Sequence, residues 1–381
     1  MNYLYWFVII AETVLLIPIL VFSLECLVAV RPSFKRSKET ETHQDYYPCT
    51  VVLVPAHNES SNIQRTLSSI TLELNSPKQI VVIADNCNDN TAELARQMGV
   101  TVLERYNEEK RGKGYAMDFG LHYLKANPPE TVVMIDADCV VQKNTINQIT
   151  RLAWSEQKPV QANYIMDVPI NPTPKDTVSA LAIIIKNSVR QFGLSKLHLP
   201  CLLTGSGMAF PWEILTKVSL ANSKTTDDMQ LGIDLAIAGY PPLHCHSGKV
   251  IGRLMERKFA TSQRSRWEHG HLDTLLTETP RLIKEAIIQK RFNLFTLALE
   301  LAVPPLSMLM LLWGGIAGMA VLVGIGWQNW WGLIISGISG AILGISLFLA
   351  WYNFARKDYP FKDLLSIPLY LLWKIPMYFV F

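Results

Sequence analysis

The sequence predicts an α/β domain with a mostly parallel sheet, attached to membrane-spanning α-helices at both ends of the chain. Between residues 46 and 290, short apolar runs alternate with segments of helical periodicity, which is the pattern of strands joined by crossover helices. Hydrophobic residues make up 49% of the 381 residues and charged residues only 18%, and the apolar excess lies at the two ends. Such apolar ends indicate membrane helices.

The first apolar segment, residues 1–30, is long enough to cross a membrane. Only Glu12 and Glu25 are charged between residues 3 and 30, whereas a hydrocarbon core needs about 20 apolar residues. A cleaved signal peptide has a basic region before its apolar run and small residues at the cleavage site. This segment has neither, so we predict an N-terminal transmembrane helix.

Residues 297–354 are predicted to form two further spans, separated by an uncharged link at 326–329 whose flanking tryptophans suit a membrane interface. Pro304 and Pro305 are expected to kink the first span. The last stretch, residues 364–381, carries a lysine among Leu, Trp and Pro. Three interpretations of this stretch are open: a third crossing near the C-terminus, a re-entrant segment and an interfacial helix.

Basic residues beside the three spans predict the orientation of the chain. The clusters are Arg31, Lys35, Arg36 and Lys38; Arg281, Lys284, Lys290 and Arg291; and Arg356, Lys357 and Lys362. All three lie on one side of the membrane, which the positive-inside tendency assigns to the cytosol. We therefore expect a cytosolic domain at residues 46–290, in a multi-pass protein of the bacterial inner (plasma) membrane.

The overall charge argues against a nucleic-acid-binding protein, and the cysteines argue against a disulfide-stabilised or zinc-binding one. A formal net charge of +3 provides no basic surface for nucleic acid. Six irregularly spaced cysteines without a Cys-x-x-Cys pair predict free thiols in a cytosolic domain, rather than disulfides or zinc ligands. We expect no nucleic-acid partner.

Four strands are predicted in the first half of the domain. They cover residues 50–54, 79–84, 100–103 and 132–135, with helices at 60–70, before residue 98 and at 115–126. In a parallel sheet of this kind, ligands bind beyond the carboxyl ends of the strands. The polar residues that follow these strands are therefore expected to converge on one crevice.

The fourth strand ends in Asp136 and Asp138. Side chains two apart on a strand point the same way, and two adjacent carboxylates tolerate their repulsion best with a divalent cation between them. Hard oxygen ligands suit Mg²⁺ or Mn²⁺. Two aspartates that cap the following turn are the alternative interpretation.

Six short motifs follow one another in a characteristic order. They are Pro55-Ala56-His57-Asn58-Glu59, residues 85–91, Gly112-Lys113-Gly114, Asp136-Ala137-Asp138, Thr226-Asp227-Asp228 and Gln263-Arg264-Ser265-Arg266-Trp267. This order, over about residues 48–270, resembles membrane-bound family 2 glycosyltransferases, which include cellulose, chitin-oligosaccharide and hyaluronan synthases and ceramide glucosyltransferases. The resemblance implies a GT-A fold, a nucleotide-sugar donor that we expect to be UDP-linked, and bound Mg²⁺ or Mn²⁺.

The resemblance implies donor-binding roles in the first half of the domain. Asp85 is expected to accept a hydrogen bond from the uracil imide, and Glu59, preceded by Pro55 and Ala56, to contact the ribose or base. Lys113, between two glycines that allow close approach, is expected at the base or pyrophosphate. Helix capping is the alternative for Asp85 and Glu59, and a solvated loop position for Lys113.

The same resemblance implies roles in metal binding and proton transfer for four acidic residues. Asp138 is the expected metal ligand, and Asp136 faces the same ion or the ribose. Asp228 matches the general base, while Asp227 stands where the family commonly has Glu. An aspartate pair that stabilises a helix N-terminus is the alternative, especially for Asp227.

The acceptor is expected to meet a small-residue loop. Gly205 and Ser206 lie in Thr-Gly-Ser-Gly-Met, which suits a sugar pocket, with Asp227 and Trp267 as further acceptor contacts. A plain tight turn is the alternative for Gly205.

The last motif combines cations with an indole. Gln263 and Arg266 are expected to contact the diphosphate, and Trp267 to stack on a sugar ring. A helix on the membrane surface, anchored by Trp267, is the alternative. His269 and His271 do not share a helical face, so we expect ordinary polar roles for both.

Together these expectations describe an inverting transfer, in which the hydroxyl of a lipid-linked or glycan acceptor attacks the anomeric carbon opposite the nucleotide. An α-linked donor then gives a β-glycoside, for a glycolipid or an extracellular polysaccharide. A processive polysaccharide synthase that cooperates with an exporter or assembly protein is one alternative. An inactive nucleotide-sugar-binding membrane subunit is another.

Overall fold

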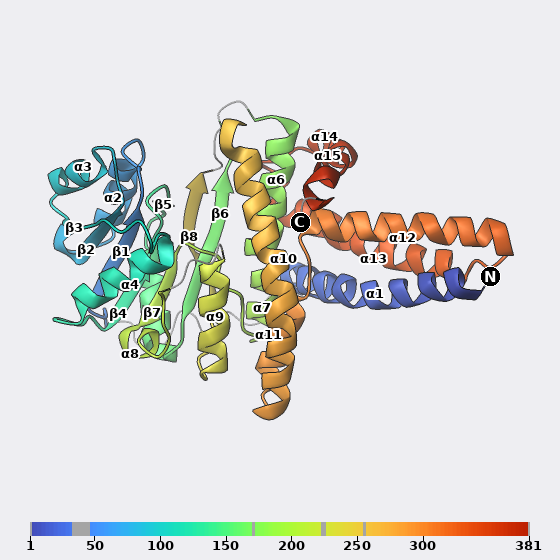
Figure 1. The fold of residues 1–381 in the computed structure, drawn as a ribbon, viewed down its shortest axis with the longest axis horizontal. Coiled ribbons are helices and arrows are strands. Elements are labelled where there is room, and N and C mark those ends of the chain that lie inside the picture. Colours follow the sequence, from blue (N-terminus) through green and yellow to red (C-terminus); the bar gives the residue numbers. More distant parts are fainter. Residues whose placement is uncertain (1, 33–45, 170–171, 222–225, 254–256, 380–381) are drawn as a thin grey trace.

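The computed structural model describes residues 2–32, 46–169, 172–221, 226–253 and 257–379, with the backbone alone at residues 2, 257–263 and 379. It consists of an α/β domain and a bundle of long apolar helices that extends away from it (Figure 1). Within the described ranges, three helices are long and apolar enough to cross a membrane: Tyr3–Val30, Leu306–Trp327 and Trp331–Phe354.

The sheet has eight strands in the order β3-β2-β1-β4-β7-β6-β8-β5. They are β1 Thr50–Ala56, β2 Ile80–Asp85, β3 Thr101–Arg105, β4 Thr131–Met134, β5 Val140–Val141, β6 Val160–Asp167, β7 Met208–Pro211 and β8 Leu243–Arg253. β7 runs antiparallel to β4 and β6, and β5 to β8, whereas the other pairs are parallel. The prediction of a mostly parallel sheet is confirmed.

Helices cover both faces of the sheet. The covering helices are α2 Ile63–Thr71, α3 Thr91–Gln97, α4 Lys113–Leu124, α5 Thr145–Glu156, α6 Pro174–Ile184, the π-helical turn η3 Ile185–Arg190, α7 Gln191–Lys196, α8 Trp212–Leu215 and α9 Asp227–Ile237. Alternate residues of β1 pack in different hydrophobic cores, because successive side chains of a strand point to opposite faces of the sheet. Val52 and Val54 pack with Ile63 of α2, while Leu53 packs with Met117 of α4.

The candidate spans α1 (Asn2–Val30), α12 (Leu306–Trp327) and α13 (Trp331–Phe354) pack against one another. The prediction of a single kinked span that begins at residue 297 is wrong for the first part of that span. Helix α11 (Phe292–Leu301) ends before Pro304 and Pro305, and α12 starts after them. Two consecutive prolines, which lack backbone donors and clash with the preceding turn, end the helix rather than bend it.

The long helix α10 (Arg257–Ile288) lies between the sheet and the bundle, and the short helices α14 (Phe361–Leu364) and α15 (Ile367–Phe379) lie beside α6 (Figure 1). A buried ion pair joins the two parts, since the Nε of Arg190 on η3 lies 2.5 Å from the Oε2 of Glu25 on α1. Gly193 on α7 gives the closest backbone approach, because a Cβ there would overlap the carbonyl oxygen of Glu25. The α/β domain is therefore fixed to the first candidate span.

Candidate active site

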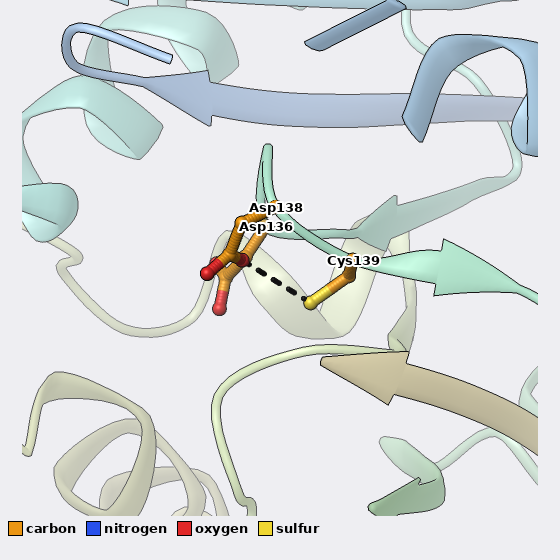
Figure 2. A group of neighbouring side chains, drawn as sticks. All are labelled: Asp136, Asp138 and Cys139. Atoms are coloured by element: carbon orange, nitrogen blue, oxygen red, sulfur yellow. Dashed lines mark hydrogen bonds between the residues drawn. The ribbon is translucent and has the colours of Figure 1, made fainter. Parts of the chain in front are cut away.

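The two aspartates of the fourth strand lie in the turn that follows it. β4 ends at Met134, and the backbone N–H of Asp136 donates a 3.0 Å hydrogen bond to the Oγ of Ser206. The side chains of Asp136 and Asp138 point to the same side, whereas Cys139 diverges from them (Figure 2). The turn, rather than strand pleating, brings the two carboxylates together.

This pair fits a hard divalent cation. Potential ligand atoms of Asp136, Asp138 and Cys139 all lie within 4.8 Å of one another. Burial, followed by the charges of Asp136 and Glu59, raises the pKa of Asp138 to about 6. Burial also raises the pKa of Cys139 well above its usual value, so the thiol stays protonated and donates to Asp138 at 3.4 Å. Two oxygen ligands and a neutral thiol suit Mg²⁺ or Mn²⁺ better than a soft metal.

Lys113 lies in the first turn of α4, close to these carboxylates. Its ammonium forms an ion pair with Asp136 and donates to the carbonyl oxygen of Gly205 at 2.6 Å. Burial alone lowers the pKa of Lys113, but the carboxylates of Asp136, Asp227 and Asp228 raise it overall. Lys113 therefore joins the acidic turn after β4 to the acidic start of α9.

Asp227 and Asp228 occupy the first turn of α9. The Oδ1 of Asp227 accepts the backbone N–H of Asp228 at 3.0 Å, which is the helix-terminus role named as its alternative. Burial, followed by the charge of Asp227, raises the pKa of Asp228 to about 6. A proton acceptor with this pKa is better matched to neutral pH than an ordinary aspartate.

Gly205 separates Asp228 from the metal-binding pair. A Cβ at Gly205 would lie 3.3 Å from the Oδ2 of Asp228 and 3.9 Å from the Oδ2 of Asp136. The φ angle of Gly205 is +98°, a conformation that favours glycine. Gln161 of β6 fixes this loop, since its side chain donates to the carbonyl of Ser206 at 2.8 Å and accepts the N–H of Thr204 at 2.8 Å. Both acidic positions therefore lie against the same glycine, where any side chain would crowd them.

The predicted nucleotide residues lie on the neighbouring strands. Pro55 and Ala56 end β1, and the carboxylate of Glu59 accepts from Asn62 at 2.9 Å. Burial, with a contribution from Asp136, raises the pKa of Glu59, which places it in the same electrostatic group. Asp85 lies apart from this group at the end of β2.

The carboxylate of Asp85 forms a buried ion pair with Arg105 of β3, at 2.5 Å. The sequence analysis did not single out Arg105. Its position in register with Asp85, on the next parallel strand, becomes visible only once the sheet is paired. Asp85 therefore has a cationic partner within the protein.

The last motif lies on α10, and its residues face different surroundings. Arg266 is exposed, whereas Arg264 is buried and its guanidinium lies 2.8 Å from the carboxylate of Asp176 on α6. Trp267 is half-buried against the main core, and the side chain of Gln263 lies outside the described residues. The buried cation of the motif is thus Arg264, while Arg266 is exposed.

A family model for "Glycosyltransferase like family 2" matches residues 48–270. The chain belongs to glycosyltransferase family 2. The matched range contains every predicted site residue of the domain, so the identification of the enzyme class is confirmed.

Two curated relatives match a shorter part of this glycosyltransferase. It is 32% identical to 4,4'-diaponeurosporenoate glycosyltransferase of Staphylococcus haemolyticus over 110 residues, which are 28% of this chain and 27% of that protein. It is 28% identical to poly-beta-1,6-N-acetyl-D-glucosamine synthase of Staphylococcus aureus over 118 residues, 29% of this chain and 27% of that protein. Each match thus spans about a quarter of the relative's length.

A solved structure resembles the whole glycosyltransferase. The mannosyltransferase PcManGT from Pyrobaculum calidifontis, in complex with GDP-Man and Mn²⁺, aligns with a TM-score of 0.57 and 18% identity, over 97% of this chain and 99% of that chain. The likeness shows the fold, a GT-A-like mixed sheet with flanking apolar helices. The predicted fold class is confirmed.

Proposed function

We propose that the enzyme transfers a sugar, with inversion, from a nucleotide diphosphate sugar to a lipid-linked or glycan acceptor at the cytosolic face of the membrane. One observation carries the proposal: the half-buried Asp228 and Asp136 lie on either side of Gly205, with their Oδ2 atoms 3.3 and 3.9 Å from the space that a Cβ there would fill. A base on one side of that space and a metal-binding pair on the other provide for deprotonation of the acceptor and for binding of the donor diphosphate.

The residues divide the chemistry between them. Asp136 and Asp138 would hold the cation, which supplies positive charge beside the diphosphate when bound. Asp228 takes the proton from the acceptor hydroxyl, and the hydroxyl oxygen attacks the anomeric carbon as the bond to the nucleotide breaks. Lys113 forms an ion pair with Asp136 and positions the Gly205 loop through its two contacts. An α-linked donor gives a β-linked product by this displacement.

We assign the nucleotide to the edge formed by β1 and β2. Pro55, Ala56, Glu59 and Asp85 all lie where these parallel strands end, which is where ligands bind in such sheets. The carboxylate of Asp85, held by its ion pair with Arg105, offers acceptor oxygens to a base N–H. This arrangement suits uracil, and we propose a UDP-linked donor.

The membrane part favours transfer to a lipid over polymer synthesis. The described residues include three candidate spans, all packed against one another. A polysaccharide channel needs a lumen, and three helices packed in this way leave little room for one. A polysaccharide synthase that works with an exporter, and an inactive donor-binding subunit, remain the alternatives.

Nucleotide release tests the proposal. The full chain is purified in detergent and incubated with Mn²⁺ or Mg²⁺ and, separately, UDP-glucose, UDP-galactose, UDP-N-acetylglucosamine and GDP-mannose, with membrane lipids as acceptors. We expect metal-dependent release of UDP and a lipid of raised mass, both lost in Asp228→Asn. Release from GDP-mannose alone would contradict the UDP assignment. Metal-dependent donor binding without release in any mixture would favour the inactive-subunit alternative.

A further inference from the structure

A cavity of about 120 Å³ lies where the α/β domain meets the candidate membrane spans. Its walls come from α1, α6 with η3, α10, the segment that starts α12, and α15. Apolar side chains line one part, including Phe22, Ile183 and Leu306, and polar side chains line another, including Lys186 and His271. Such a cavity suits an amphiphile, with an apolar chain toward the bundle and a polar head toward the domain.

Most of the cations at this cavity already have partners. Three form ion pairs with carboxylates: Arg190 with Glu25, Arg264 with Asp176, and Lys374 with Glu268. Lys186 forms no ion pair or hydrogen bond with another described residue, although burial lowers its pKa. Because a partly desolvated ammonium without an ion-pair partner is costly, Lys186 indicates a negatively charged ligand at the cavity.

A second polar side chain at the cavity has one unsatisfied atom, although its ring also forms a hydrogen bond with the backbone of Leu301. His271 is 4% exposed and lines the cavity, and its Nε2 makes no hydrogen bond with any described residue. Buried polar atoms are nearly always satisfied in native proteins, so an unpaired Nε2 at a cavity wall indicates a ligand atom or water. Lys186 and His271 interact electrostatically, which places them near one another.

Lys186 also links the cavity electrostatically to the proposed base. Lys186 interacts electrostatically with Asp228 as well as with Arg190 and Glu300. It lies on η3, a π-helical turn, and such turns occur frequently at functional sites. A head group at Lys186 would therefore lie close to the catalytic carboxylate.

We propose that this cavity binds the lipid acceptor, and that the acceptor's head carries an oxyanion, a phosphate ester or a carboxylate, which Lys186 and His271 bind beside the attacking hydroxyl. This inference rests on the proposed transfer to a lipid, and it adds the charge of the acceptor. A hydrogen bond with His271 alone would be enough for a neutral hydroxyl head group. The charge of Lys186, in contrast, requires an anionic head group. The apolar wall of Phe22, Ile183 and Leu306 accommodates the start of the lipid chain.

Three amphiphiles with the same tail test the proposal: oleyl phosphate, oleate and oleyl alcohol. Their binding to the detergent-purified full chain is measured by titration calorimetry in mixed micelles. We expect at least one anion to bind about tenfold or more tightly than the alcohol, which corresponds to about 1.4 kcal/mol. Preference for oleyl phosphate assigns a phosphate ester, and preference for oleate assigns a carboxylate.

Lys186→Met should reduce this preference to less than about twofold, and Lys186→Arg should retain it because the charge is kept. The matched control is Lys143→Met, which removes an exposed lysine on the loop between β5 and α5 and should leave the preference intact. Equal binding of all three amphiphiles, or an unchanged preference in Lys186→Met, would overturn the proposal. If Lys186→Met instead shifts the acid limb of the pH–rate profile with the preference unchanged, Lys186 tunes Asp228 and the proposal fails.

The two proposals fail in different ways. Metal-dependent UDP release together with equal binding of the three amphiphiles rejects only the charged acceptor. Preference for an anion, without nucleotide release from any donor, rejects the transferase reaction at this site and leaves the anion site standing.

Discussion

The pH dependence of transfer depends on the environment of Asp228. Burial and the neighbouring charge of Asp227 raise the pKa of Asp228 to about 6, whereas an ordinary aspartate has a pKa of about 3.9. A general base acts only when unprotonated. We therefore expect kcat/KM to reach half its plateau near pH 6 and to fall at least about tenfold for each pH unit below that, because protonation of Asp138 also weakens donor binding there.

Two substitutions separate the effect of the adjacent Asp227 charge from that of the Asp228 base itself. Asp227→Asn removes the adjacent charge but keeps the size of the side chain, so the pKa of Asp228 should fall and the acid limb should move to lower pH. Asp228→Asn removes the base, and kcat should fall about 100- to 10,000-fold while metal-dependent UDP binding persists.

The assay is the initial rate of nucleotide release at subsaturating donor, from about pH 5 to about pH 8. Asp273→Asn, on an exposed position of α10, is the matched control and should keep the parent profile. A flat profile in the parent enzyme would refute the base assignment. An acid limb that stays in place in Asp227→Asn would refute the argument from the adjacent charge.

Three further predictions concern the metal pair and two glycines. Asp138→Asn should weaken Mn²⁺-dependent UDP binding about tenfold or more, and in the parent this binding should decline below about pH 6, because protons compete for a carboxylate with that pKa. Gly205→Ala places a methyl group 3.3 Å from the Oδ2 of Asp228 at a φ of +98°, so kcat should fall about tenfold or more while UDP binding changes little. Gly193→Ala overlaps the backbone of Glu25 and should destabilise the protein by about 1–3 kcal/mol, measured as a lower Tm.

The two glycine predictions each have a matched control. Gly239→Ala carries the same backbone strain, at a φ of +111°, in open space, and should retain activity. Gly337→Ala on α13 meets nothing within 4 Å and should retain the parent Tm. Equal activity losses in Gly205→Ala and Gly239→Ala would show that strain alone is responsible. Unchanged pH dependence of Mn²⁺-dependent UDP binding would contradict the metal assignment.

The fold was largely predictable because its signals are local. Short apolar runs bounded by turn residues, such as residues 50–54, indicate strands, and their alternation with helical segments permits few arrangements other than a parallel sheet. The break at Pro304 and Pro305 was misjudged, because a kink and a helix end look alike in sequence. Packing of α11 against α10 separates the two outcomes.

The sequence by itself determined which acidic residues lie at the carboxyl ends of strands, because the strand pattern and the order of the motifs are local properties of the sequence. Only the tertiary structure decided their partners: Arg105 beside Asp85, Asp176 beside Arg264, and Glu25 beside Arg190. It also placed Lys186, which follows an apolar run in the sequence, at a cavity wall without an ion-pair partner among the described residues. The physical reason is that ion pairing and burial depend on distances between elements far apart in the chain, and no local pattern encodes those distances.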